Sequence, residues 1–83
     1  MSPAIRTRWL SPTETRGTRV SAWSVEPSLF RGPFLAWDYA LDTLENHRMA
    51  LCAMLAKHEQ LGVPSEWHPG STENGYIWVR VKR

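Results

Sequence analysis

The sequence predicts a small α+β domain in which one amphipathic helix packs on one face of a three- to four-stranded, mainly antiparallel sheet. Three observations predict this fold. The chain has 83 residues, of which 42% are hydrophobic and 22% charged, as is typical of one globular domain. Polar and apolar residues alternate near both ends, and a helical pattern lies between them. We therefore expect one domain over residues 1–83 with the order β-β-(β)-α-β.

Two strands are predicted at Ile5–Leu10 and Thr18–Val25, because the character of their side chains alternates. The intervening segment Ser11–Gly17 has the proline, threonine and glycine content of a turn. Successive side chains of a strand point to opposite faces, so three arginines and one tryptophan are expected to share a face. These residues are Arg6, Arg8, Arg19 and Trp23.

The helix is predicted over Thr43–Leu61. Asp42 is placed to cap its start, Glu45 follows at capping-box spacing, and Gly62 ends it. Its apolar stripe consists of Leu44, Ala50, Leu51, Met54, Leu55 and Leu61, and Glu45, Asn46 and Lys57 are expected away from that stripe. The preceding segment Phe34–Trp37 is either a short third strand or an extended run into the helix.

A polar loop is expected over Val63–Asn74, with Trp67 folded back over the edge of the core, and a last strand follows at Gly75–Lys82. Ile77, Val79 and Val81 alternate there with aromatic and basic residues. Because β-branched side chains suit the face that a helix covers, the other side chains are expected to point away from the helix. These are Tyr76, Trp78, Arg80 and Lys82.

Charge is distributed unevenly along the chain. The formal net charge is +2, but residues 1–31 carry +3, residues 32–76 carry −4 and residues 77–83 carry +3. If the first and last strands are neighbours, their basic residues gather on one uncovered face. The predicted binding face comprises Arg6, Arg8, Arg19, Trp23, Tyr76, Trp78, Arg80 and Lys82.

Four interpretations of this face remain open. Trp, Tyr and Arg are the residue types that dominate protein interfaces. Aromatic planes beside cations also bind single-stranded nucleic acid. Alternatively, the arginines only cover the indoles through cation–π contacts, or a second copy of the chain covers the face in a homodimer.

The residues predict no enzyme, cofactor or metal site. The sequence has no glycine-rich phosphate loop, nucleophile elbow or CxxC motif. His47 and His58 are about 16 Å apart on one helix, which is too far for one metal ion, so each is expected to be a hydrogen-bonded histidine at the edge of the core. Cys52 has only Arg48 as a cation at helical spacing, which is too little to predict a nucleophile.

Localisation is predicted from what the sequence lacks. No apolar run approaches the ~18–20 residues that a membrane span needs, and the start of the chain shows no signal-peptide pattern. The single cysteine excludes an internal disulfide. We therefore expect a cytoplasmic protein that does not bind membranes.

Several segments together resemble a group of small uncharacterised proteins encoded by phages, prophages and mobile elements of proteobacteria. The resemblance is carried by IRTR (residues 5–8) with SPTETRGTR (11–19), by WDYAL (37–41) with ENHR (45–48) and Ala50, and by Gly75-Tyr76 before a valine-rich end. It implies a non-enzymatic phage protein, active in the host cytoplasm, that binds a host protein complex stoichiometrically. It further implies inhibition of bacterial defence, as by anti-CRISPR proteins.

Two functional hypotheses follow. The first is this protein-binding inhibitor, which uses the basic and aromatic face; an acidic flank of the helix (Asp38, Asp42, Glu45 and Glu59) is a second candidate surface. The alternative is an accessory protein that binds single-stranded nucleic acid through the same basic and aromatic face.

Overall fold

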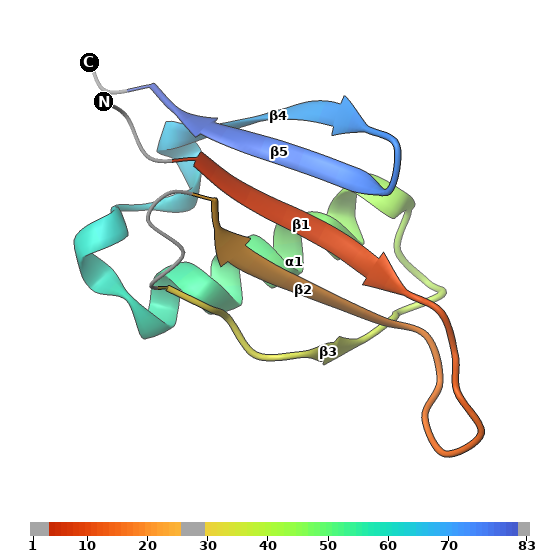
Figure 1. The fold of residues 1–83 in the computed structure, drawn as a ribbon. Coiled ribbons are helices and arrows are strands. Elements are labelled where there is room, and N and C mark those ends of the chain that lie inside the picture. Colours follow the sequence, from red (N-terminus) through yellow and green to blue (C-terminus); the bar gives the residue numbers. More distant parts are fainter. Residues whose placement is uncertain (1–3, 26–29, 82–83) are drawn as a thin grey trace.

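The computed structural model describes residues 4–25 and 30–81, which form a five-stranded antiparallel sheet with one main helix on one side (Figure 1). The strand order is β3-β2-β1-β5-β4. The strands are β1 (Ala4–Leu10), β2 (Arg19–Ser24), β3 (Leu35–Ala36), β4 (Trp67–Thr72) and β5 (Gly75–Arg80). The helices are α1 (Thr43–Lys57) and two 3-10 turns, η1 (Glu59–Leu61) and η2 (Pro64–Glu66). The α+β class is confirmed, and the sheet has more strands than predicted.

Strand β1 lies in the middle of the sheet, paired with β2 on one side and β5 on the other. The basic segments from the two ends of the chain are therefore neighbours, as expected. The connection from β1 to β2 extends beyond the sheet (Figure 1) and is closed by a turn in which the Thr13 amide donates to the Arg16 carbonyl at 2.7 Å.

The segment Phe34–Trp37 contains the short strand β3. Leu35 pairs with Val20 and Ala36 with Arg19, so β3 forms one edge of the sheet. The Trp37 amide donates to the Thr18 carbonyl at 2.9 Å, which extends the contact towards the helix.

Strand β4 lies where a polar loop was predicted, and that prediction was wrong. The sequence WHPGST contains a proline and a glycine, which are rare inside strands. β4 pairs only with β5 and forms the other edge of the sheet. An edge strand tolerates proline because one side of its backbone needs no ladder partner.

Helix α1 begins as predicted and ends four residues earlier than predicted. The Asp42 side chain accepts a hydrogen bond from the Glu45 amide at 2.8 Å, which is the N-cap geometry. After Lys57 the chain tightens into η1 and reverses at Gly62. Gly62 has φ +91° and ψ −156°, a region open essentially to glycine alone.

Asn46 was expected on the polar side of the helix, and it is buried instead. Its side-chain oxygen accepts from the Asp38 amide at 2.8 Å, and its side-chain nitrogen donates to the Asp38 carbonyl at 2.9 Å. The amide thus ties the incoming chain to the first turns of α1, a role that hydrophobic periodicity does not reveal.

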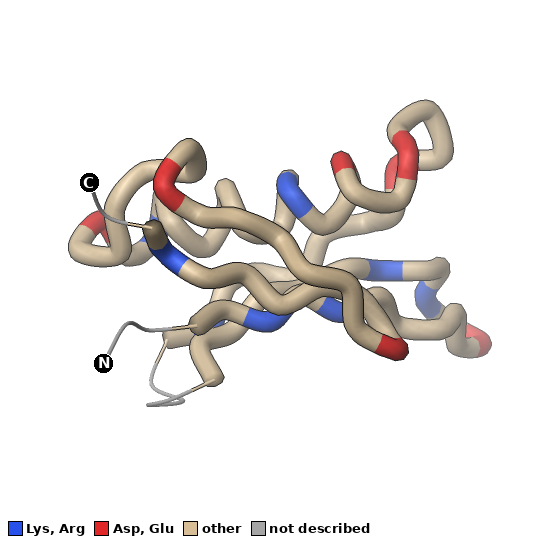
Figure 2. Tube along the Cα trace, turned by 90° about the horizontal axis from the view of Figure 1, so that it is seen from above, with Lys and Arg blue, Asp and Glu red and all other residues tan. Residues whose placement is uncertain are grey.

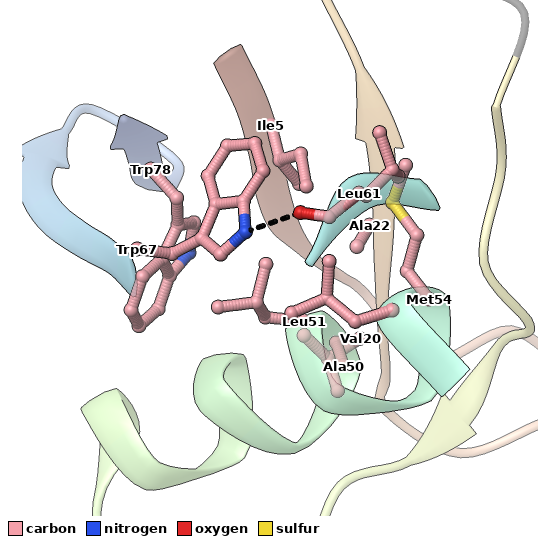
Figure 3. Close-up of a cluster of buried hydrophobic side chains, with 10 residues drawn as sticks. Ile5, Val20, Ala22, Ala50, Leu51, Met54, Leu61, Trp67 and Trp78 are labelled. Carbon is pink, nitrogen blue, oxygen red and sulfur yellow. Dashed lines mark hydrogen bonds between the residues drawn. The ribbon is translucent and has the colours of Figure 1, made fainter. Parts of the chain in front are cut away.

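The core lies between the sheet and α1, and it includes two tryptophans (Figure 3). Trp67 is buried and donates through Nε1 to the Leu61 carbonyl at 3.0 Å, so the prediction that it folds over the core is confirmed. Trp78 is 0% exposed and packs among Ile5 and Leu51. The prediction that Trp78 points away from the helix was wrong.

Strand β5 is therefore turned over relative to the prediction. Trp78 lies opposite Ile5 in the register, whereas Val79, which was expected to face the helix, is 47% exposed. Both faces of β5 are apolar, so alternation alone does not choose between them. The indole decides the orientation because it buries more apolar area than valine and its N–H finds a buried acceptor. None of the helices in the described residues has the length and hydropathy needed to cross a membrane.

Candidate functional site: the outer face of the sheet

The face of the sheet opposite α1 carries half of the predicted binding residues. We call it the outer face and define it by Arg6, Arg8, Leu10, Arg19, Ser21, Trp23, Ile77 and Val79, with Arg31 and Phe34 beside β2. Arg6, Arg8, Arg19 and Trp23 lie on it as predicted, because they alternate with the buried residues of β1 and β2. Lys82 lies outside the described residues.

Tyr76, Trp78 and Arg80 lie on the helix side of β5, so their predicted place on the outer face was wrong. Tyr76 is half-buried against the core. Arg80 donates from Nη2 to the Glu66 carboxylate at 3.1 Å. Arg80 therefore forms an ion pair within the fold. On β5, the side chains that point to the outer face are Ile77 and Val79 instead of Tyr76, Trp78 and Arg80.

Trp23 lies at the centre of a row that crosses the sheet. It pairs with Arg6 of β1 on one side, and a single antiparallel bridge places Arg31 on its other side. Arg6 in turn pairs with Ile77 of β5. The Cβ atoms of directly paired residues are about 5 Å apart, so Trp23 has an arginine as its neighbour on both sides.

A second aromatic ring lies at the β3 edge of the outer face. Phe34 is 60% exposed, and the Arg19 guanidinium carbon lies 5.4 Å from the centre of its ring. This is a cation–π contact. One face of Phe34 is therefore already occupied. The predicted shielding concerned the indoles, and among the described residues the indole that an arginine covers is that of the buried Trp78, with the Arg48 guanidinium carbon 5.6 Å from its ring centre.

Acidic residues are absent from all five strands, which the structure describes in full. On the helix side, Arg48 pairs with Glu45 at 3.3 Å and Arg80 with Glu66. In contrast, Arg6, Arg8, Arg19 and Arg31 make no ion pair with any residue in the described ranges. Figure 2 shows this separation: most basic positions follow the sheet, and most acidic ones lie in the layer of the helix and its turns. The outer face is therefore predominantly positive. Glu73, in the turn between β4 and β5, is the acidic residue that lines a depression beside Arg6 and Arg8, and it forms no ion pair with either.

A shallow groove of about 270 Å³ runs across the outer face between Trp23 and Phe34. Apolar atoms of Leu10 and of the two aromatic side chains line it, and Ser21 and Gly32 lie at its floor. Arg8 and Arg31 are the charged residues at the groove. The outer face thus combines an apolar depression with flanking cations.

Beneath this face, a hydrogen-bond network fixes the positions of β1 and β5 relative to α1. The Trp78 Nε1–H donates to the Thr7 hydroxyl oxygen at 2.9 Å, and His47 Nδ1 lies 2.9 Å from that oxygen. The Tyr76 carbonyl is farther from it, at 3.5 Å. The Thr7 hydroxyl donates to that carbonyl, and its oxygen lies within hydrogen-bond distance of both ring nitrogens, Trp78 Nε1 and His47 Nδ1.

Gly75 permits this arrangement because a side chain there has no room. A Cβ atom on Gly75 would collide with the Thr7 carbonyl oxygen and lie 2.8 Å from His47 Cε1. The backbone of β5 thus approaches β1 and the His47 ring closely. His47 is buried with a hydrogen-bond partner, so its predicted structural role is confirmed; His58 similarly bonds to the Arg31 carbonyl at 3.2 Å.

Stability is expected to fall as the pH is lowered through 6.5, and His47 is the cause. Burial lowers the pKa of His47 below its ordinary value of 6.5, and an interaction with the Thr7 backbone offsets part of this shift. Below pH 6.5, the His47 imidazole is therefore protonated more fully in the unfolded chain than in the folded chain. His47 contributes full stability above pH 6.5, and this contribution is lost progressively towards its lower folded-state pKa.

Denaturant unfolding at several pH values measures this effect. His47→Gln should reduce the pH dependence below 6.5, whereas His68→Gln, which removes an exposed imidazole, should keep it. Equal slopes in the wild type and His47→Gln would contradict the assignment to His47.

Other groups with catalytic or binding potential have structural partners. Burial raises the pKa of the Cys52 thiol, the Arg48 guanidinium lowers it in part and Glu45 adds to the rise; this direction opposes nucleophilic reactivity. Of the acidic flank, Asp42 caps α1, Glu45 pairs with Arg48, and Asp38 accepts a hydrogen bond from the Ala40 amide. In residues 4–25 and 30–81, no three His, Cys, Asp or Glu side chains form a group that could hold a metal ion.

Comparisons of the chain with protein-family models, with curated proteins and with solved structures found no match.

Proposed function

We propose that this protein is a small non-enzymatic binding protein that attaches stoichiometrically to a host protein complex through the outer face. The observation that carries this proposal is the set of four arginines without ion pairs in the described residues, which share with Trp23 one face of a sheet whose strands contain no acidic residue. Complementary charge steers a partner to such a surface, and Trp and Arg are frequent centres of binding energy. The expected partner surface is acidic.

A role in inhibiting bacterial defence completes this proposal, and it is supported by the sequence resemblance to phage and prophage proteins alone. An inhibitor of this kind needs a rigid scaffold and one binding patch, rather than a catalytic site. The packed core beneath the outer face supplies such a scaffold.

Charge reversal on the outer face tests the proposal. Arg6→Glu with Arg8→Glu should weaken capture of host proteins from lysate at least about tenfold, or ~1.4 kcal/mol. Arg16→Glu with Lys57→Glu is the matched control, because it changes the net charge equally at exposed positions away from that face. The captured protein is then purified and its complex reconstituted to measure stoichiometry. Equal binding by the two double variants would contradict the proposal.

Single-stranded nucleic acid is the second candidate partner, because Arg6, Arg8 and Arg31 are exposed and make no ion pair with a described residue, so they can contact phosphates. Its affinity should fall steeply between about 50 and 200 mM salt, since phosphate contacts release counterions. Titration of labelled single-stranded DNA and RNA at both salt concentrations checks this candidate. No binding at the lower concentration would eliminate it.

A further inference from the structure

We propose that the groove between Trp23 and Phe34 is an anchor pocket, and that it takes one apolar side chain carried by an acidic peptide segment. This inference depends on the proposed function, since it names the part of the partner that enters the outer face. In the groove, a depression coincides with two aromatic rings and with cations that make no ion pair with a described residue. A neighbouring depression of the outer face, lined by Arg6, Arg8 and Trp23, is also lined by Glu73, whereas none of the acidic residues that the structure describes lines the groove.

The size of the groove indicates one side chain. Its volume of about 270 Å³ lies just below the ~300–1,000 Å³ of sites that enclose small molecules. Its walls are Leu10, Trp23 and Phe34, and the nearly buried Ser21 lies at its floor. An apolar side chain inserted there removes apolar surface from water on both partners, which is the main favourable contribution to association.

The charges around the groove indicate an acidic segment. Arg8 and Arg31 line it, and neither pairs with a carboxylate in the described residues. Carboxylates on both sides of an inserted side chain would meet these guanidinium groups. A second copy of this chain fits poorly, because it would bring two sets of unpaired arginines together.

Nucleobases are a weaker match to the same groove. The Arg19 guanidinium already covers one face of Phe34 at 5.4 Å, and Trp23 is half-buried between two arginines. Stacking of successive bases requires open aromatic faces. An aliphatic or aromatic side chain instead needs only the depression between the rings.

The probes that test this proposal are labelled glutamate-rich peptides that differ at one central residue. The wild-type protein should bind the peptide with a central phenylalanine about thirtyfold more tightly than the one with serine, the difference expected of an interface hot spot. Ser21→Leu fills the groove and should abolish this preference. Ser71→Leu makes the same change at an exposed position on β4 and should retain it.

A second variant keeps the test decisive if Ser21→Leu does not fold, as judged by circular dichroism. Phe34→Ser removes an exposed wall of the groove without filling it and should also abolish the preference for phenylalanine. Three results would overturn the proposal: equal affinity for the two peptides, tighter binding of single-stranded DNA than of either peptide, or self-association that Ser21→Leu disrupts.

Failure of the anchor pocket is distinguishable from failure of the proposed function. If the peptides do not differ but Arg6→Glu with Arg8→Glu still abolishes partner capture, the outer face is the interface and the groove is not its anchor. If that double variant captures partners normally, the proposed function itself is wrong.

Discussion

Replacing Trp78 with alanine is expected to destabilise the fold by about 3–5 kcal/mol, as for other large-to-small substitutions of buried tryptophan. The indole is 0% exposed and its Nε1–H satisfies the buried Thr7 hydroxyl. The substitution therefore leaves a cavity beneath α1 and removes a hydrogen bond. Chemical denaturation monitored by circular dichroism measures the loss of free energy.

Ile77→Ala is the control for this prediction, because Ile77 is the adjacent residue on the opposite, outer face of β5. It removes an aliphatic side chain that is only half-buried. The free energy of unfolding should therefore fall much less than in Trp78→Ala. A larger loss for Ile77→Ala than for Trp78→Ala would show that β5 has the opposite orientation.

Thr7→Val is expected to lower the free energy of unfolding by about 1–3 kcal/mol for each buried group that loses its hydrogen-bond partner. Valine has nearly the same shape as threonine, so the loss comes from hydrogen bonds rather than packing. Two groups are affected, Trp78 Nε1–H and His47 Nδ1, each at 2.9 Å from the Thr7 oxygen. Thermal and denaturant unfolding measure the change.

Two further variants identify the source of that loss. Thr7→Ser keeps the hydroxyl and should lose only about 1 kcal/mol for the missing methyl group. Thr7→Val combined with Trp78→Phe removes donor and acceptor together, so its cost should be smaller than the sum of the single variants. Additive costs would show that the Thr7 hydroxyl does not couple to Trp78.

The sequence predicted the elements whose signals are local. The alternation in β1 and β2, the Asp42 cap and the apolar stripe of α1 each depend on neighbouring residues, and the structure agrees with them. Strand β4 was missed because Pro69 and Gly70 are typical of loops, and only the position of β4 at the edge of the sheet makes them acceptable.

The candidate site was predicted in part, for a related reason. Trp23 and the arginines of β1 and β2 share a face through simple alternation, which a sequence displays. The orientation of β5 depends instead on how Trp78 packs with Thr7, a residue 71 positions away. Arg31 joins the outer face through a single bridge in an irregular connection, so no periodic pattern could identify it.

The central position of β1 constrains when the protein can fold during synthesis. β1 is made early, yet one of its two neighbours, β5, emerges from the ribosome only after α1 and β4. Until then, one backbone edge of β1 has no ladder partner, and such an edge invites mispairing. Pairing β5 with β1 closes a long loop, and the chain loses conformational entropy before the new hydrogen bonds and packing contacts stabilise the pair. We therefore expect nascent chains stalled before β5 to remain protease-sensitive and open to capture by chaperones.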